Sequence, residues 1–145
     1  MPSVWRHVLA ALAGVAAGLG AYTFVYARGY SYFSDNPDAC ANCHIMRAQR
    51  DSWQRSSHHS FAVCNDCHTP HAPALKYAAK ARNGWNHSLH FTLQDYPDPV
   101  RIRPFNAEVL EANCLRCHAD MADNAAGLHC VACHASVGHG PGREP

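Results

Sequence analysis

The sequence predicts a mostly α-helical protein with irregular loops, in which one N-terminal transmembrane helix precedes a small domain. Three observations support this fold class. Residues 8–27 contain no Asp, Glu, Lys or Arg, and all eight cysteines occur in copies of one short motif. The 145-residue chain also leaves too few residues after its apolar segment for a large apolar core. We therefore expect a transmembrane signal-anchor at residues 1–30 and a folded domain at residues 31–145.

The apolar segment has the length of a membrane-spanning helix. Twenty uncharged residues, at about 1.5 Å each, match a hydrocarbon core about 30 Å thick. Arg6 precedes this stretch and Arg28 follows it. Aromatic residues suited to the membrane interfaces lie near its ends: Trp5, Tyr22, Tyr26, Tyr30 and Tyr32. These features predict a single-pass helix in contact with membrane lipid.

The alternative to an anchor is a cleaved signal peptide. Val25-Tyr26-Ala27 is a poor cleavage site and the apolar stretch is long for a signal peptide, so we expect the segment to be retained. Gly14 and Gly18 form a G-x-x-x-G pattern, which lets two membrane helices approach closely. Self-association through the span is therefore a candidate interaction.

Every cysteine belongs to a Cys-x-x-Cys-His motif, the attachment signature of c-type haem. The attachment residues are Cys40, Cys43, Cys64, Cys67, Cys114, Cys117, Cys130 and Cys133. A disulfide scaffold, a zinc site or a thioredoxin-like dithiol would leave some cysteine pair without a following histidine, and here no pair lacks one. The sequence therefore predicts four covalently bound haem c groups, which would supply the core of the domain.

The rest of the domain is expected to form short helices separated by loops. Residues 45–60 read as a polar helix, and Pro73 begins a second helix that runs to about residue 91. A proline-rich loop follows. A third helix begins near Asn106 and reaches the third motif. The formal net charge of +1 provides no basic field for nucleic acid, so no such partner is expected.

Each haem iron takes two axial ligands, and histidines are the main candidates. From the residues alone, the motif histidine is the first choice for each haem, including His44 for the first. Further histidines outside the motifs supply distal candidates: His58, His59, His71, His87, His90, His129 and His139. Their number exceeds the need, so some of them are expected to be ordinary polar residues.

The order of these motifs resembles the NapC/NirT family of tetrahaem quinol dehydrogenases, in particular the small membrane subunits of cytochrome c nitrite reductases. The resemblance covers nearly the whole chain. It rests on the single span, Cys40-Ala-Asn-Cys43-His44-Ile-Met46, Ser57-His58-His59 ahead of Cys64-Asn-Asp-Cys67-His68-Thr-Pro-His71, the lysine-bearing helix before Gly84, and the closing motifs that end in Gly138-His139.

The resemblance implies that Met46 ligates the first iron in place of His44 and leaves the other face of that haem open. The motif histidines that remain proximal ligands are His68, His118 and His134. The resemblance also implies that His59 and His139 are the distal ligands of the last two haems, with His58 as the alternative to His59. The sixth ligand of the second haem stays open between His71 and a lysine of a partner protein.

Lys76, Lys80 and His87 are spaced four and seven residues apart and share one helix face. From the residues alone, the simplest interpretation is a solvated basic face. The resemblance implies instead that Lys80 lies at a quinol pocket with a nearby acid or base. The acidic residue of the family is replaced by His87 in this sequence, and Asp95 is the alternative proton acceptor.

The function implied by the resemblance is oxidation of menaquinol and transfer of electrons to a periplasmic multihaem reductase. The expected partner is the catalytic subunit of cytochrome c nitrite reductase, and no residue set in this chain suggests nitrite reduction itself. The implied location is the inner membrane with the haem domain in the periplasm, because haem c is attached outside the cytoplasm. A general quinol dehydrogenase serving several reductases and a soluble tetrahaem shuttle remain alternatives.

Overall fold

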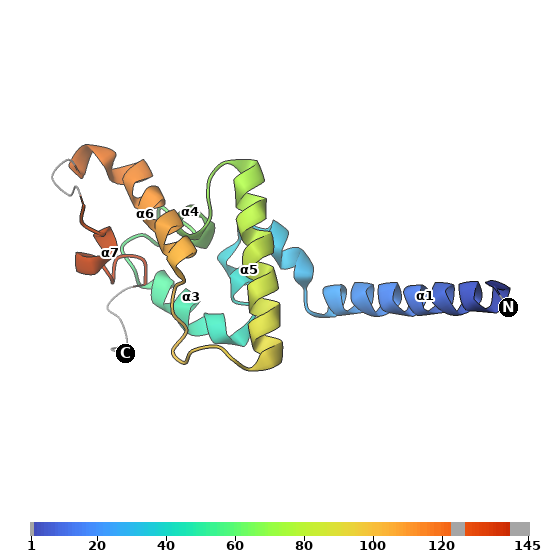
Figure 1. Ribbon diagram of the computed structural model, residues 1–145. Helices are drawn as coiled ribbons and strands as arrows, with labels where there is room; N and C mark the ends of the chain where they lie inside the picture. The colour runs from blue at the N-terminus through green and yellow to red at the C-terminus, as the bar shows by residue number, and fades with distance from the viewer. Residues whose placement is uncertain (1, 123–126, 140–145) are drawn as a thin grey trace. The chain divides into compact units, whose positions relative to one another are not determined.

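The computed structural model describes residues 2–122 and 127–139. In this part of the chain the secondary structure is helical, with no strand (Figure 1). The mostly α fold with irregular loops is therefore confirmed. Residues Met1–Ser34 and Asp35–Pro145 form two compact units, which are described separately.

The first unit consists of α1 (Pro2–Tyr26) and the short 3₁₀ helix η1 (Gly29–Phe33). Within α1, the stretch Ser3–Tyr26 is long and apolar enough to cross a membrane, and none of its side chains is buried. The helix ends where Arg28 adopts a left-handed conformation, with φ 52°. Gly29 then lies against the ring of Phe24, where any Cβ would clash. A larger residue at this position would therefore require the Phe24 ring to move.

The second unit contains six α-helices and two 3₁₀ helices among its described residues. They are α2 (Pro37–Cys40), η2 (His44–Met46), α3 (Arg47–Gln54), α4 (Cys64–His68), α5 (Pro73–Leu93), α6 (Pro104–His118), η3 (Ala119–Met121) and α7 (Cys130–Cys133).

Proline begins three of these helices. Pro37, Pro73 and Pro104 each occupy the start of a helix, where the missing N–H costs nothing and the fixed φ suits the helix. The side chain of Asn36 also caps α2 by accepting from the Asp38 N–H at 2.9 Å. The predicted helix from Pro73 is confirmed, whereas α6 begins at Pro104 and therefore two residues before the predicted Asn106.

The predicted helix over residues 45–60 is wrong beyond Gln54, where α3 ends. The chain turns back at this point because the Trp53 indole N–H donates to the Ala62 carbonyl at 3.0 Å. Turn hydrogen bonds from Ser56 N–H to Trp53 and from Phe61 N–H to His58 replace the helical pattern. The turn exposes His59 and leaves His58 half-buried.

The second unit has almost no core of apolar side chains. Among the described residues Ala79 is the only buried apolar residue, and no large side chain is fully buried. Large apolar residues such as Phe61 and Trp85 remain exposed, at 89% and 71%. A polypeptide of this size without an apolar core needs another source of buried apolar surface, and the porphyrin rings predicted by the sequence would supply it.

Candidate haem-binding motifs and the polar face of helix α5

The four Cys-x-x-Cys-His motifs lie at short helical segments. The second motif forms α4, the third ends α6, the first four residues of the fourth form α7, and the first joins α2 to η2. Residues three apart in a helix lie on the same face, so the two thiols of each helical motif project to one side. All eight cysteines are free. Free thiol pairs on helical turns fit covalent attachment of haem, which uses both sulfurs.

The motifs are adjacent in pairs. The thiols of Cys40 and Cys64 are hydrogen-bonded to each other, and this contact lowers the pKa of Cys40 and raises that of Cys64. The sulfurs of Cys114 and Cys130 lie within 4.8 Å of each other and of a Glu111 carboxylate oxygen. The first motif thus lies next to the second, and the third next to the fourth.

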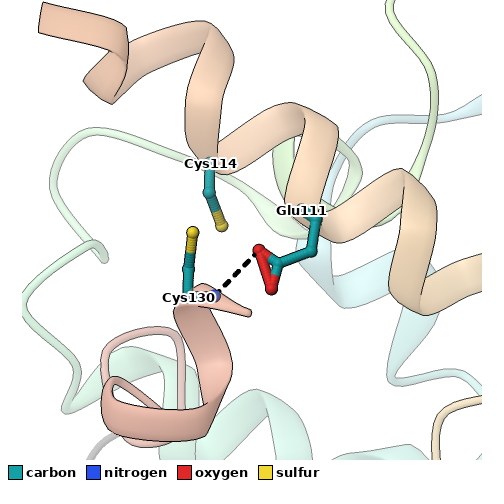
Figure 2. A group of neighbouring side chains, drawn as sticks. All are labelled: Glu111, Cys114 and Cys130. Carbon is teal, nitrogen blue, oxygen red and sulfur yellow. Dashed lines mark hydrogen bonds between the residues drawn. The ribbon is translucent and has the colours of Figure 1, made fainter. Parts of the chain in front are cut away.

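Glu111 joins the third motif to the fourth (Figure 2). Its carboxylate accepts a hydrogen bond from the Cys130 backbone N–H at 3.1 Å. A side-chain hydrogen bond to Glu111, followed by desolvation, raises the pKa of the Cys130 thiol to about 11. Desolvation and then Glu111 also raise the pKa of Cys114. Both thiols therefore stay protonated near neutral pH, which disfavours a disulfide between them before haem is attached.

Two histidine pairs have the separation expected of axial ligands. The ring centroids of His58 and His118 are 6.1 Å apart, and those of His68 and His139 are 5.9 Å apart. Two imidazoles that bind opposite faces of one metal ion place their ring centres about 6 Å apart, given a metal–nitrogen bond of about 2 Å. The residues present therefore fit haem iron held between each pair.

The first pair uses His58, the alternative to His59, and the second pair differs from the assignment that the resemblance implied for His139. His58, not His59, faces the third motif, because its ring centroid lies 6.1 Å from that of His118. The Nδ1 of His58 also lies 3.1 Å from the Val137 carbonyl oxygen. The His59 ring instead packs edge-on against Trp53, with centroids 4.9 Å apart. His139 faces His68 of the second motif, whereas the resemblance assigned it to one of the last two haems.

The other predicted iron ligands and their alternatives occupy the following positions. Met46 is half-buried at the end of η2, and His44 at its start is exposed. His134 is exposed directly after α7. His71, the candidate for the second haem, lies with its Nε2 3.1 Å from the Asp66 carbonyl oxygen.

The polar face of α5 begins with two lysines bound to one carboxylate. The Lys76 ammonium lies 2.6 Å from Asp35 Oδ2, and the Lys80 ammonium lies 3.4 Å from Asp35 Oδ1. Lys80 is only 7% exposed. A solvated basic face, the simplest interpretation from the residues alone, is therefore wrong for Lys80.

The C-terminal end of the same face carries two histidines. His90 Nδ1 lies 2.6 Å from Asp95, and Arg103 lies 2.7 Å from His90 Nε2. Desolvation, followed by the charges of Arg103 and His90, lowers the pKa of His87. His87 as a whole remains exposed, so its desolvation is partial. His87 is nevertheless neutral near pH 7, and a neutral imidazole can accept a proton.

Comparison with known proteins places these motifs in a family. Residues 2–112 match the model of the NapC/NirT cytochrome c family, N-terminal region. The chain belongs to this family. Membership in the NapC/NirT cytochromes means that haem c is bound covalently, and together with α1 it indicates a membrane-anchored protein. The predicted resemblance is thus confirmed.

Individual relatives of this NapC/NirT protein agree with the family match. It is 39% identical over 147 residues to the cytochrome c-type protein NrfH of Wolinella succinogenes, covering 90% of this chain and 83% of that protein. It is 33% identical over 132 residues to the cytochrome c nitrite reductase subunit NrfH of Nitratidesulfovibrio vulgaris, covering 88% of this chain and 81% of that one.

A solved structure is also similar over nearly the whole chain. It is the cytochrome c nitrite reductase NrfHA complex bound to the HQNO inhibitor, one chain of which matches with a TM-score of 0.67 and 29% identity. The match covers 92% of this chain and 93% of that chain. The likeness therefore includes both the apolar helix and most of the domain that carries the motifs.

Sequence reasoning did not find several polar residues that organise the site. Asp35, Asn65 and Asn113 each bond to groups at least 30 residues away in the chain. Asp35 and Asn113 lie outside the motifs, and Asn65 occupies a variable position of the second motif. Asp35 lies in a polar linker before the first motif, where nothing in the local sequence distinguishes it from a solvated carboxylate.

Proposed function

We propose that this chain is a membrane-anchored tetrahaem cytochrome c that oxidises menaquinol and passes the electrons to the catalytic subunit of a periplasmic cytochrome c nitrite reductase. The observation that carries this proposal is the match over 92% of the chain to one chain of the NrfHA complex. The four attachment motifs and the apolar helix α1 support it independently, because a quinol-linked carrier needs both.

The haem groups would be held by the eight cysteines and by side chains of the same unit. Haem c, when bound, supplies one-electron transfer. The proposed ligands are Met46 for the first haem, His68 for the second, His118 for the third and His134 for the fourth. The ring separations support His58 as the distal partner of His118, and they pair His139 with His68.

The quinol would be handled by the polar face of α5. Oxidation of a quinol releases two protons, so the site needs a hydrogen-bond donor that positions the head group and a base. Lys80 can donate, and its ammonium lies 3.4 Å from the Asp35 carboxylate. His87 can accept a proton, because its lowered pKa leaves it neutral. Asp95 is hydrogen-bonded to His90, which makes it the weaker candidate for the base.

The proposed topology follows from the same chemistry. Residues 1–30 would cross the inner membrane once, and residues 31–145 would lie in the periplasm, where haem c is attached. Gly14 and Gly18 have no atom within 4 Å of where a Cβ would stand. This small surface suits close contact with a second membrane helix, so self-association stays a prediction.

Purification from membranes tests the assembly. We expect intact-mass measurement to show four haem increments on a chain that retains its N-terminal residues, and a nitrite reductase catalytic subunit to copurify in a fixed ratio. A mass without the first twenty or so residues would indicate a soluble shuttle. Copurification with several reductases and no fixed partner would indicate a general quinol dehydrogenase.

Substitutions on α5 test the quinol site. Lys80→Ala and His87→Ala should each leave four haems and membrane insertion intact while lowering menaquinol-dependent haem reduction by about ten- to a thousandfold. Dithionite should still reduce every haem. The control is Arg101→Ala, which removes an exposed cation from the loop after α5. Quinol-dependent rates equal to the control in both variants would place the pocket elsewhere.

A further inference from the structure

The buried polar side chains of the second unit form one connected network. Among the described residues these buried side chains are Asn65, Thr69, Lys80 and Asn113. Asp35 Oδ1 accepts from Asn65 Nδ2 at 2.6 Å, and Lys80 lies 3.4 Å from the same oxygen. The Thr69 hydroxyl donates to the Asn65 carbonyl at 2.8 Å, and Asn113 Nδ2 donates to the Thr69 carbonyl at 3.0 Å.

This network connects α5 to the haem motifs. Asn65 stands between Cys64 and Cys67 in the second motif, and Asn113 directly precedes the third motif. Asn113 also donates to the Cys67 carbonyl at 2.9 Å. Asp35 therefore links the α5 lysines to the backbone that carries the second motif, and through it to α6. These bonds therefore join α5 to the second and third motifs.

The carboxylate of Asp35 is the only acidic member of the network. Hydrogen bonding from Lys76, opposed by desolvation and supported by Asn65 and by the charge of Lys80, holds the pKa of Asp35 at about 2. Asp35 is therefore anionic across the physiological range. A buried ammonium is costly without a counter-ion, and in this network Asp35 is the counter-ion of Lys80.

We propose that Asp35 is a positioning residue of the quinol site, which holds the Lys80 ammonium on α5 in place against the peptide of the second haem motif. This inference rests on the proposed function, because it takes Lys80 as the group that donates to the quinol head group. Asp35 does not touch the quinol and acts only through Lys80. The chemistry it supports is hydrogen-bond donation to a quinol oxygen by a cation at a fixed place.

The test uses the haem-loaded, membrane-anchored protein in detergent, with HQNO and a menaquinol analogue as probes. Asp35→Asn keeps the size of the side chain and removes its charge. We expect it to raise both the HQNO dissociation constant and the KM for the quinol by about tenfold, with kcat changed less, because a lost hydrogen bond from a charged donor weakens binding. Haem content and dithionite reduction should be unchanged.

Asp38→Asn is the matched control. It removes one carboxylate from the same segment, and Asp38 pairs with Arg50 at 2.6 Å rather than with a lysine of α5. We expect this variant to bind HQNO like the unaltered protein. Asp35→Glu restores the charge and should recover most of the lost affinity, whereas a role in folding alone would not make affinity follow charge.

The double variant Asp35→Asn with Lys80→Ala distinguishes the positioning role of Asp35 from the quinol role of Lys80. If Asp35 acts through Lys80, the double variant should match Lys80→Ala within about twofold, because no ammonium remains to be positioned. If the losses of HQNO affinity in the two single variants multiply in the double variant, the positioning role of Asp35 is refuted while the quinol role of Lys80 stands. The same holds if Asp35→Asn binds HQNO normally and Lys80→Ala does not. If Lys80→Ala binds HQNO normally, the proposed quinol role of Lys80 fails, and that of Asp35 with it.

An Asp35→Asn chain that does not assemble would be replaced by Asp35→Glu, whose longer side chain keeps the charge but shifts it. We expect this variant to retain four haems and to change the KM for the quinol by less than about threefold. A loss of haem content in Asp35→Glu as well would show that the carboxylate serves folding, and would overturn the proposal.

Discussion

Asn113 offers a direct measure of how much the buried polar network stabilises the domain. Its amide donates to the Cys67 carbonyl at 2.9 Å and to the Thr69 carbonyl at 3.0 Å, and the residue is 9% exposed. Asn113→Ala would leave both carbonyls without this donor. At about 1 kcal/mol for each unsatisfied and largely buried group, the substitution should lower the free energy of unfolding by about 2 kcal/mol.

The expected shift is large enough to measure by thermal unfolding. For a domain of about 100 residues, 1 kcal/mol corresponds to about 4–8 °C in Tm, so Asn113→Ala should lower Tm by about 10 °C. Far-UV circular dichroism of the haem-loaded protein follows the loss of helix. The control is Gln49→Ala on the exposed face of α3, which should change stability by less than about 0.5 kcal/mol.

A small effect would contradict this argument. If Tm of Asn113→Ala lies within about 2 °C of the control, the contacts between α4 and α6 do not depend on the Asn113 amide. The haem groups and their attachment would then be sufficient to hold the two motifs together. Within the network, only the contacts of Asp35 with Asn65 and Lys80 would keep a proposed role.

Three further predictions concern the ligands and the acid stability. His58→Ala should convert about one of the four haems from low to high spin, measured by electron paramagnetic resonance, because the ring centroid of His58 lies 6.1 Å from that of His118. His59→Ala should leave the spin states unchanged. The reverse outcome would restore His59 as the ligand. Met46→Ala should remove the high-spin signal of the first haem together with quinol oxidation, and an equal effect from His44→Ala alone would assign that ligand to the motif histidine. The pKa of Asp35 in the folded protein is about 2, below its unfolded value of about 3.9, so the ionised carboxylate stabilises the fold above pH 4 and this stabilisation is lost as the pH falls from about 4 to 2. Denaturant unfolding should show a loss of about 1 kcal/mol in the free energy of unfolding, after screening of the half-exposed carboxylate. Asp35→Asn should not show this loss.

The features predicted correctly from the sequence are those whose chemistry is local. A histidine after every second cysteine determines the class of cofactor, because attachment needs two thiols and one imidazole within five residues. The uncharged stretch determines the apolar helix by its length. Proline at the start of α5 determined where that helix begins. In each case the residues that act together are neighbours in the chain.

The sequence does not predict how two neighbouring histidines are oriented. His58 and His59 are adjacent, and either could reach an iron. The choice depends on a turn that the Trp53 indole closes onto the Ala62 carbonyl, and this turn also ends α3 earlier than predicted. The pairing of His139 with His68 joins residues 71 positions apart, and no spacing rule connects them.

The sequence by itself therefore determined that this protein carries covalently bound haem on a domain attached to an apolar helix. Only the tertiary structure decided which residues hold the polar face of α5 in place. Asp35 meets Asn65, Lys76 and Lys80 across 30, 41 and 45 residues, and each of these residues alone resembles an ordinary polar surface position. The physical reason is that a buried charge requires a partner, and the identity of that partner is set by the fold, not by the neighbouring sequence.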